Sequence, residues 1–160
     1  KAINNASIPM GAVAASRTIH DTIVNSGAQG AIELFHGYTY SAHPAAAAAA
    51  VATLDLYRRE GLFERAASLA PTFEAAAHSL RDAKHVKDIR NLGMIAGVEL
   101  EPRDGAPGAR AYEAFVKCFE AGVLVRFTGD ILAFSPPLII DEEQIAHLFK
   151  TVGDVLATVQ

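Results

Sequence analysis

Three stretches of the sequence carry side chains that could do chemistry. Lys1 supplies an amine, the turn His36-Gly37-Tyr38-Thr39-Tyr40-Ser41-Ala42-His43-Pro44 gathers hydroxyl and imidazole groups, and Arg126 stands two residues before Thr128-Gly129-Asp130. Amines can act as nucleophiles, hydroxyl groups can bind phosphate, and a planar guanidinium can hold a carboxylate through two hydrogen bonds. Residue type and spacing alone also allow simpler interpretations. These are a solvated amine at Lys1, a local hydroxyl–backbone hydrogen bond at Thr39 and a surface charge at Arg126.

The elements that position these groups differ along the chain, and the first sixty residues predict short elements joined by loops. Met10–Ala15 is a run of small apolar residues that predicts a buried strand. Ser16 is a good N-cap for a helix over residues 17–25. Pro44 suits the first turn of an alanine-rich helix that continues to about Glu60.

The rest of the chain predicts a compact α+β unit. A helix is expected over Leu62–Arg81, with a kink or a break at Pro71. The order after it is β-β-α-β-β-α, which predicts an antiparallel sheet covered on one face by helices. The expected strands and helices lie at residues 86–90, 94–100, 112–119, 123–127 and 131–134, and in a last helix capped by Asp141 and Gln144. We therefore expect a boundary near Glu60–Leu62, which divides the chain into residues 1–60 and 61–160.

Apolar side chains at helical spacing mark the helix expected at residues 112–119. Tyr112, Phe115, Val116 and Phe119 stand at i, i+3, i+4 and i+7. Cys118 lies on its final turn and is expected to be inert. Arg90 and Glu99, on the first two strands, are expected to form a cross-strand ion pair or to be solvated.

Composition excludes several classes of partner. The net charge is −4 and the basic residues are scattered, so nucleic acid and an anionic membrane surface are not expected partners. No apolar run approaches the ~20 residues of a membrane-spanning helix. The single cysteine, Cys118, allows no disulfide within the chain and fits a cytoplasmic protein. No group of His, Cys or carboxylate residues has metal-site spacing, and His36 and His43 are expected to be structural, bonded to backbone.

The order of motifs resembles a known family. Lys1 is followed by Asn4-Asn5-Ala6-Ser7-Ile8-Pro9-Met10-Gly11, then by the His36–Pro44 turn, and finally by Val125-Arg126-Phe127-Thr128-Gly129-Asp130. This order is similar to the second half of class III (omega) aminotransferases of the beta-alanine–pyruvate type, which are fold-type I enzymes. The resemblance spans essentially the whole chain and implies an α/β fold. Residues 1–60 would end the large cofactor-binding domain, and residues 61–160 would form the small α+β domain.

The resemblance also implies roles for four side chains. Lys1 would be the Schiff-base lysine that binds pyridoxal 5'-phosphate and moves a proton between the substrate carbon and the cofactor. Thr39 would bind the cofactor phosphate of the other subunit, so the active site would be shared within a homodimer or a dimer of dimers. Tyr38 would frame that turn or line the pocket. Arg126 would pair with the substrate carboxylate and swing aside for amines that lack one.

The activity implied is the transfer of an amino group from an omega-amino acid or amine to pyruvate. Other parts of the cofactor site would lie upstream of Lys1, so we expect the missing N-terminal half to be required and this chain alone to be inactive. Ala2, Asn4 and Ala6 depart from the Gly, Thr and Gly that are frequent in the family's lysine loop. Two alternatives stay open at this point. One is another class III activity, an aminomutase or a decarboxylating transaminase, and the other is a non-enzymatic α+β ligand-binding or dimerisation module.

Overall fold

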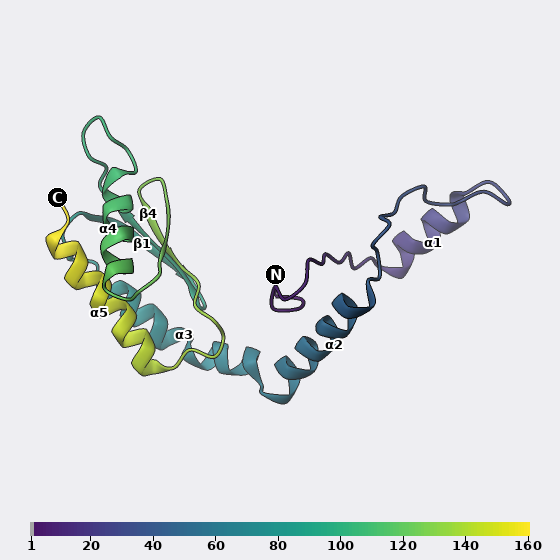
Figure 1. Ribbon diagram of the computed structural model, residues 1–160, viewed down its shortest axis with the longest axis horizontal. Helices are drawn as coiled ribbons and strands as arrows, with labels where there is room; N and C mark the ends of the chain where they lie inside the picture. The colour runs from purple at the N-terminus through teal and green to yellow at the C-terminus, as the bar shows by residue number, and fades with distance from the viewer. Residues whose placement is uncertain (1) are drawn as a thin grey trace. The chain divides into compact units, whose positions relative to one another are not determined.

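The structure is a computed structural model that describes residues 2–160. The chain divides into two compact units, Lys1–Glu60 and Gly61–Gln160 (Figure 1). The assignment of the first unit to the end of a large cofactor-binding domain, and of the second to a small domain, stays a prediction.

The first unit contains two helices, and both begin where capping chemistry predicts. In α1 (Arg17–Ser26) the Ser16 hydroxyl accepts a hydrogen bond from the Ile19 N–H at 3.3 Å. In α2 (Pro44–Arg59) proline occupies the first turn, where its missing N–H has no helical partner to lose. His43 caps this helix because its Nδ1 accepts from the Ala46 N–H at 3.4 Å. The structural role expected for His43 is therefore confirmed.

The strand expected over Met10–Ala15 is wrong. These residues are exposed and have no regular secondary structure, and among the described residues no strand pairs with them. Val13, at the centre of the run, is 96% exposed. A strand requires a neighbour that accepts and donates its ladder hydrogen bonds, and small apolar residues do not supply that neighbour themselves.

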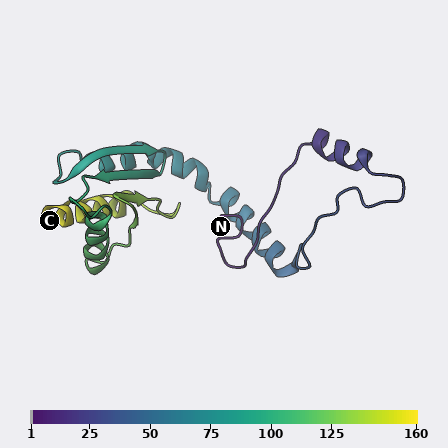
Figure 2. The same cartoon turned by 90° about the horizontal axis from the view of Figure 1, so that it is seen from above.

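The second unit has the predicted order β-β-α-β-β-α after its first helix. Its elements are α3 (Leu62–His78), β1 (Val86–Leu92), β2 (Ile95–Leu100), α4 (Ala109–Glu120), β3 (Arg126–Thr128), β4 (Ile131–Phe134) and α5 (Glu142–Thr158). The four strands form one antiparallel sheet in the order β1-β2-β4-β3. Helices α3, α4 and α5 pack on one face of this sheet (Figure 2). The predicted α+β layer is therefore confirmed.

Successive side chains of a strand point to opposite faces of the sheet, so one face is buried in the core and the other is open. On the core face, the Phe134 ring lies 5.1 Å from the Phe149 ring, which lies 5.2 Å from the Phe73 ring. On the open face, the strand register places Arg90, Gly97, Ala133 and Arg126 in one cross-strand row. This row brings Arg126 onto the side of the sheet that the helices leave uncovered.

Helix α3 passes through Pro71 without interruption, so the predicted break is wrong. Proline removes one hydrogen bond to the residue four positions earlier, here Ala67. Both residues are exposed, so water can take the place of the missing donor. Leu69 and Phe73, on the buried side of the same turns, pack into the core and keep the helix continuous.

Helix α4 buries a different face from the one that its large side chains indicate. Its buried residues are Arg110, Ala111, Ala114 and Cys118. Tyr112 and Phe119 are more than half exposed. Small side chains let the helix backbone approach its neighbours closely. The face with the alanines and Cys118 therefore packs into the core, although the face with Tyr112 and Phe119 has larger apolar side chains.

The last helix, α5, begins with the predicted capping box. The Asp141 Oδ1 accepts from the Gln144 N–H at 2.8 Å, and the Gln144 Oε1 accepts from the Asp141 N–H at 3.1 Å. Across residues 2–160, no helix has the length and apolar character needed to cross a membrane.

Candidate active site

A tight turn presents the hydroxyl-rich motif of the first unit. The Ser41 N–H donates to the Tyr38 carbonyl at 3.0 Å, which places Thr39 and Tyr40 at the centre of the turn. Thr39 is exposed, and neither its hydroxyl nor its N–H makes a hydrogen bond to any described residue. The local hydrogen bond that residue type alone would give Thr39 is therefore absent. Its two donors are left available to a ligand.

A hollow of about 460 Å³ adjoins this turn. The segment Pro9–Val13 forms one side, and Tyr38, Tyr40, His43 and the start of α2 form the other. The structure thus brings together the Pro-Met-Gly loop and the tyrosine turn, which lie 25 or more residues apart in the sequence. Tyr38 lines the hollow, and its ring makes an edge contact with His36 at 5.1 Å.

Lys1 itself lies outside the described residues, so its predicted role stays a prediction. The loop that follows it is held by two contacts that the sequence analysis does not single out. The Asn4 Nδ2 donates to the Ile8 carbonyl at 2.7 Å, and the Tyr57 hydroxyl donates to the Ala2 carbonyl at 2.6 Å. The second contact joins residues 55 positions apart. No local sequence pattern signals it.

Arg126 begins β3 in the second unit, and its guanidinium has no partner among residues 2–160. It is exposed, and it makes no hydrogen bond or ion pair with any described residue. The other lysines and arginines of residues 61–160, a range that the structure describes completely, each have a hydrogen-bond or ion-pair partner. These partners are found for Arg65, Arg81, Lys84, Lys87, Arg90, Arg103, Arg110, Lys117 and Lys150.

Arg90, in the same cross-strand row, shows the contrast. Its Nη1 lies 2.9 Å from the Asp88 Oδ2 and 3.0 Å from the Glu99 Oε2. The ion pair expected between Arg90 and Glu99 is confirmed. Arg126 has no such carboxylate partner among the described residues, so its charge remains available to a carboxylate from outside the unit.

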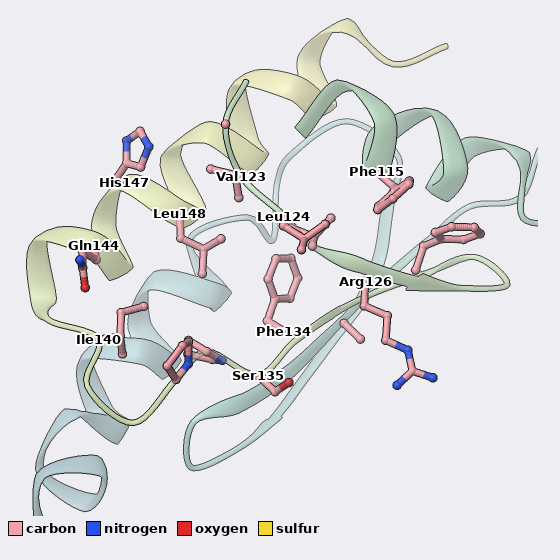
Figure 3. Close-up of a pocket in the computed structure, with 16 residues that line it drawn as sticks. Phe115, Val123, Leu124, Arg126, Phe134, Ser135, Ile140, Gln144, His147 and Leu148 are labelled. Atoms are coloured by element: carbon pink, nitrogen blue, oxygen red, sulfur yellow. The ribbon is translucent and has the colours of Figure 1, made fainter. Parts of the chain in front are cut away.

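An apolar cavity of about 600 Å³ lies beside Arg126. Figure 3 shows it between α4, α5 and the ends of β3 and β4, with Phe115, Leu124 and Phe134 among its lining residues. The Arg126 side chain extends away from these apolar groups, so its charge is not buried among them. Burying an unpaired charge in such a cavity would be costly.

A family comparison decides what these features belong to. The family model described as aminotransferase class-III matches residues 1–156. The chain is a class III aminotransferase sequence. The resemblance carried by the lysine loop, the tyrosine turn and the Arg126 strand is therefore confirmed at the level of the family.

Named relatives of this class III chain agree with that membership. It is 56% identical over 159 residues to an omega-aminotransferase of Caulobacter vibrioides and 46% identical over 157 residues to a beta-alanine–pyruvate aminotransferase of Pseudomonas aeruginosa. These alignments cover 99% and 98% of this chain, but 36% and 35% of the relatives. The chain therefore spans about a third of the length of the relatives it matches.

A solved transaminase structure confirms the fold class. It comes from directed evolution of transaminases by ancestral reconstruction and is 28% identical to this chain. The two superpose with a TM-score of 0.91 over 99% of this chain and 36% of the other. The class III chain thus has the α/β fold of transaminases, including the small antiparallel sheet of its second unit.

The cysteine and the potential metal ligands described in the class III chain do not form a second reactive site. Cys118 is fully buried in α4, and burial raises the pKa of its thiol to about 11, so the thiolate is scarce at neutral pH. This agrees with the inert role expected from the sequence. Among residues 2–160, no group of three or more His, Cys, Asp or Glu side chains is arranged to hold a metal ion.

Proposed function

We propose that this chain is the C-terminal part of an omega-amino acid–pyruvate aminotransferase that uses pyridoxal 5'-phosphate. The reaction moves an amino group from an omega-amino acid or another amine to pyruvate. The observation that carries the proposal is the 56% identity, over 99% of the chain, to an enzyme named omega-aminotransferase. The free donors at Thr39 and the unpaired charge at Arg126 supply side chains suited to this reaction.

Membership of the family implies pyridoxal 5'-phosphate, and the described residues fit part of it. When bound, the cofactor supplies an electron sink for the carbon that carries the amino group. A phosphate group takes several hydrogen bonds, and the exposed Thr39 hydroxyl and N–H are two unused donors. We assign Thr39 to the cofactor phosphate of the partner subunit and Tyr38 to the wall of the pocket. This assignment makes the enzyme a homodimer, or a dimer of dimers, with shared active sites.

Lys1 would hold the cofactor and move the proton. To accept a proton from the reacting carbon, its amine must be unprotonated near neutral pH. Removal from water and nearby positive charge both favour the neutral amine. The N-terminal half of the enzyme would supply the rest of this environment, so this chain by itself is expected to be inactive.

Arg126 would hold the substrate carboxylate. A guanidinium that already serves protein carboxylates, as that of Arg90 does, has fewer donors to offer a substrate. The Arg126 guanidinium has all of its donors free among the described residues. An exposed side chain can also swing aside when the donor amine has no carboxylate.

The enzyme would work in the cytoplasm, in keeping with its one unpaired, buried cysteine. Within the same family, an aminomutase or a decarboxylating transaminase would use the same groups. The alternative of a non-enzymatic ligand-binding or dimerisation module is disfavoured because the named relatives are aminotransferases.

Colour exchange in the full-length enzyme tests the proposal. The enzyme loaded with cofactor should be yellow, should bleach with beta-alanine and should recover its colour with pyruvate. A protein that stays colourless with added cofactor would contradict the proposal and favour the module. Bleaching that pyruvate does not reverse, with isomerised amine or carbon dioxide as product, would favour the other class III activities.

A further inference from the structure

The loop after Lys1 adopts a backbone conformation that needs external support. Residues 2–6 form successive turns, and Asn5 and Ala6 have φ values of 54° and 56°. Residues with a β-carbon rarely adopt this left-handed region. Asparagine tolerates it better than most, but at Ala6 it costs on the order of 1–2 kcal/mol. Two consecutive residues in this region persist only if neighbouring contacts hold them there.

The first support comes from Asn4, inside the loop. Asn4 as a whole is only 3% exposed, although asparagine is usually a surface residue. The Nδ2 donates to the Ile8 carbonyl at 2.7 Å, and the Asn4 carbonyl accepts from the Ser7 hydroxyl at 2.6 Å and from the Ser7 N–H at 3.2 Å. These three hydrogen bonds close the chain from residue 4 to residue 8.

The second support comes from α2, far along the sequence. The Tyr57 hydroxyl donates to the carbonyl of Ala2 at 2.6 Å. Tyr57 lies on the last turn of a 16-residue helix, so it is attached to the longest regular element of the first unit. The carbonyl it binds belongs to the residue directly after Lys1.

We infer that Tyr57 and Asn4 are positioning residues that fix the backbone on the C-terminal side of Lys1. This inference rests on the proposed role of Lys1 as the residue that moves the proton. Proton transfer requires donor and acceptor within hydrogen-bond distance, and a misplacement of about 1 Å can cost on the order of 100-fold in rate. Neither residue touches the substrate in this account. Both act through the loop.

The test uses the full-length enzyme and a single turnover. The donor amine is mixed with enzyme loaded with cofactor, and the bleaching of the cofactor is followed without pyruvate. The first-order rate constant reports how well each competent molecule transfers the proton, whereas the amplitude reports how many molecules are competent. This separation distinguishes positioning from partial unfolding.

Two variants remove one hydrogen bond each with little change of shape. Tyr57→Phe loses the hydroxyl that holds Ala2, and Asn4→Leu loses the donor to Ile8 without adding a charge. We expect each to lower the rate constant about 10-fold, with the amplitude largely kept. Tyr112→Phe and Asn25→Leu are the controls, because neither side chain makes a hydrogen bond to a described residue, and both variants should bleach at the rate of the unmodified enzyme.

Rate constants within twofold of the unmodified enzyme would overturn the inference, even if the amplitudes fell, because the contacts would then be merely structural. Failure of the unmodified enzyme to bleach with any amine would instead contradict the proposed function. The two failures are therefore distinguishable in one set of measurements.

Discussion

Arg126 and Arg90 stand in one row of the sheet and have opposite surroundings. Arg90 lies within 3.0 Å of both Asp88 and Glu99, and hydrogen bonds to Glu99 and Asp88 raise the pKa of its guanidinium. Arg126 has no carboxylate partner among the described residues. Only the second arrangement leaves a guanidinium available to a carboxylate from outside the chain, which is the role proposed for Arg126.

Replacement of Arg126 should affect only reactants that carry the carboxylate. In Arg126→Gln we expect kcat/KM for pyruvate to fall about 10- to 100-fold, the equivalent of a lost charged hydrogen bond of about 1.5–3 kcal/mol. The bleaching rate with an amine that has no carboxylate should stay unchanged. Steady-state kinetics with pyruvate and single-turnover rates with the amine make the comparison.

Arg90→Gln is the matched control for that substitution. It removes an equal charge from the same row but breaks only the two ion pairs to Asp88 and Glu99, which have no part in the proposed reaction. An equal loss with pyruvate in both variants, or an equal loss with both reactants in Arg126→Gln, would contradict the assigned role.

The side chains suited to chemistry could be predicted from the sequence, but their partners could not. Residue type and family resemblance point to Thr39 and Arg126. Whether a donor is free depends on which residues the fold brings near it, and that is visible only in three dimensions. The contact between Tyr57 and Ala2 was missed for the same reason, since 55 residues separate the two groups.

At the scale of elements, the features that could be predicted are those fixed by local chemistry. Ser16, Pro44 and Asp141 start helices because each satisfies or avoids an unpaired N–H within its own turn. The predictions that were wrong concern features that depend on neighbouring elements of the fold. The segment Met10–Ala15 has no pairing partner in the described part of the chain, and α3 continues through Pro71 because core packing holds it.

The cap of α5 permits a test of this local chemistry. Asp141→Ala removes a side chain that bonds the first turn of α5, and we expect the free energy of unfolding to fall by about 1 kcal/mol. Urea unfolding of the enzyme, followed by circular dichroism, measures this change. Asp104→Ala, in an exposed loop, is the control and should leave the free energy unchanged. A loss no larger than that of the control would show that the cap contributes nothing to stability.

At the scale of the whole molecule, this chain is about a third of the length of its named relatives. Its first unit carries the residues assigned to the cofactor, Lys1, Tyr38 and Thr39, and its second unit carries Arg126. Every part of the proposed function depends on the covalent attachment of the cofactor at Lys1. Without that attachment, the roles proposed for Thr39 and Arg126, which are to bind the cofactor phosphate and the substrate carboxylate, would not apply.

Borohydride reduction of the full-length enzyme loaded with pyridoxal 5'-phosphate, followed by peptide mapping, tests that attachment directly. The proposed function predicts one reduced cofactor per chain, on Lys1, and none after Lys1→Ala. Lys150→Ala, which removes an exposed lysine paired with Asp154, should keep the full label. A label on any other lysine, or no label in the unmodified enzyme, would contradict the central claim.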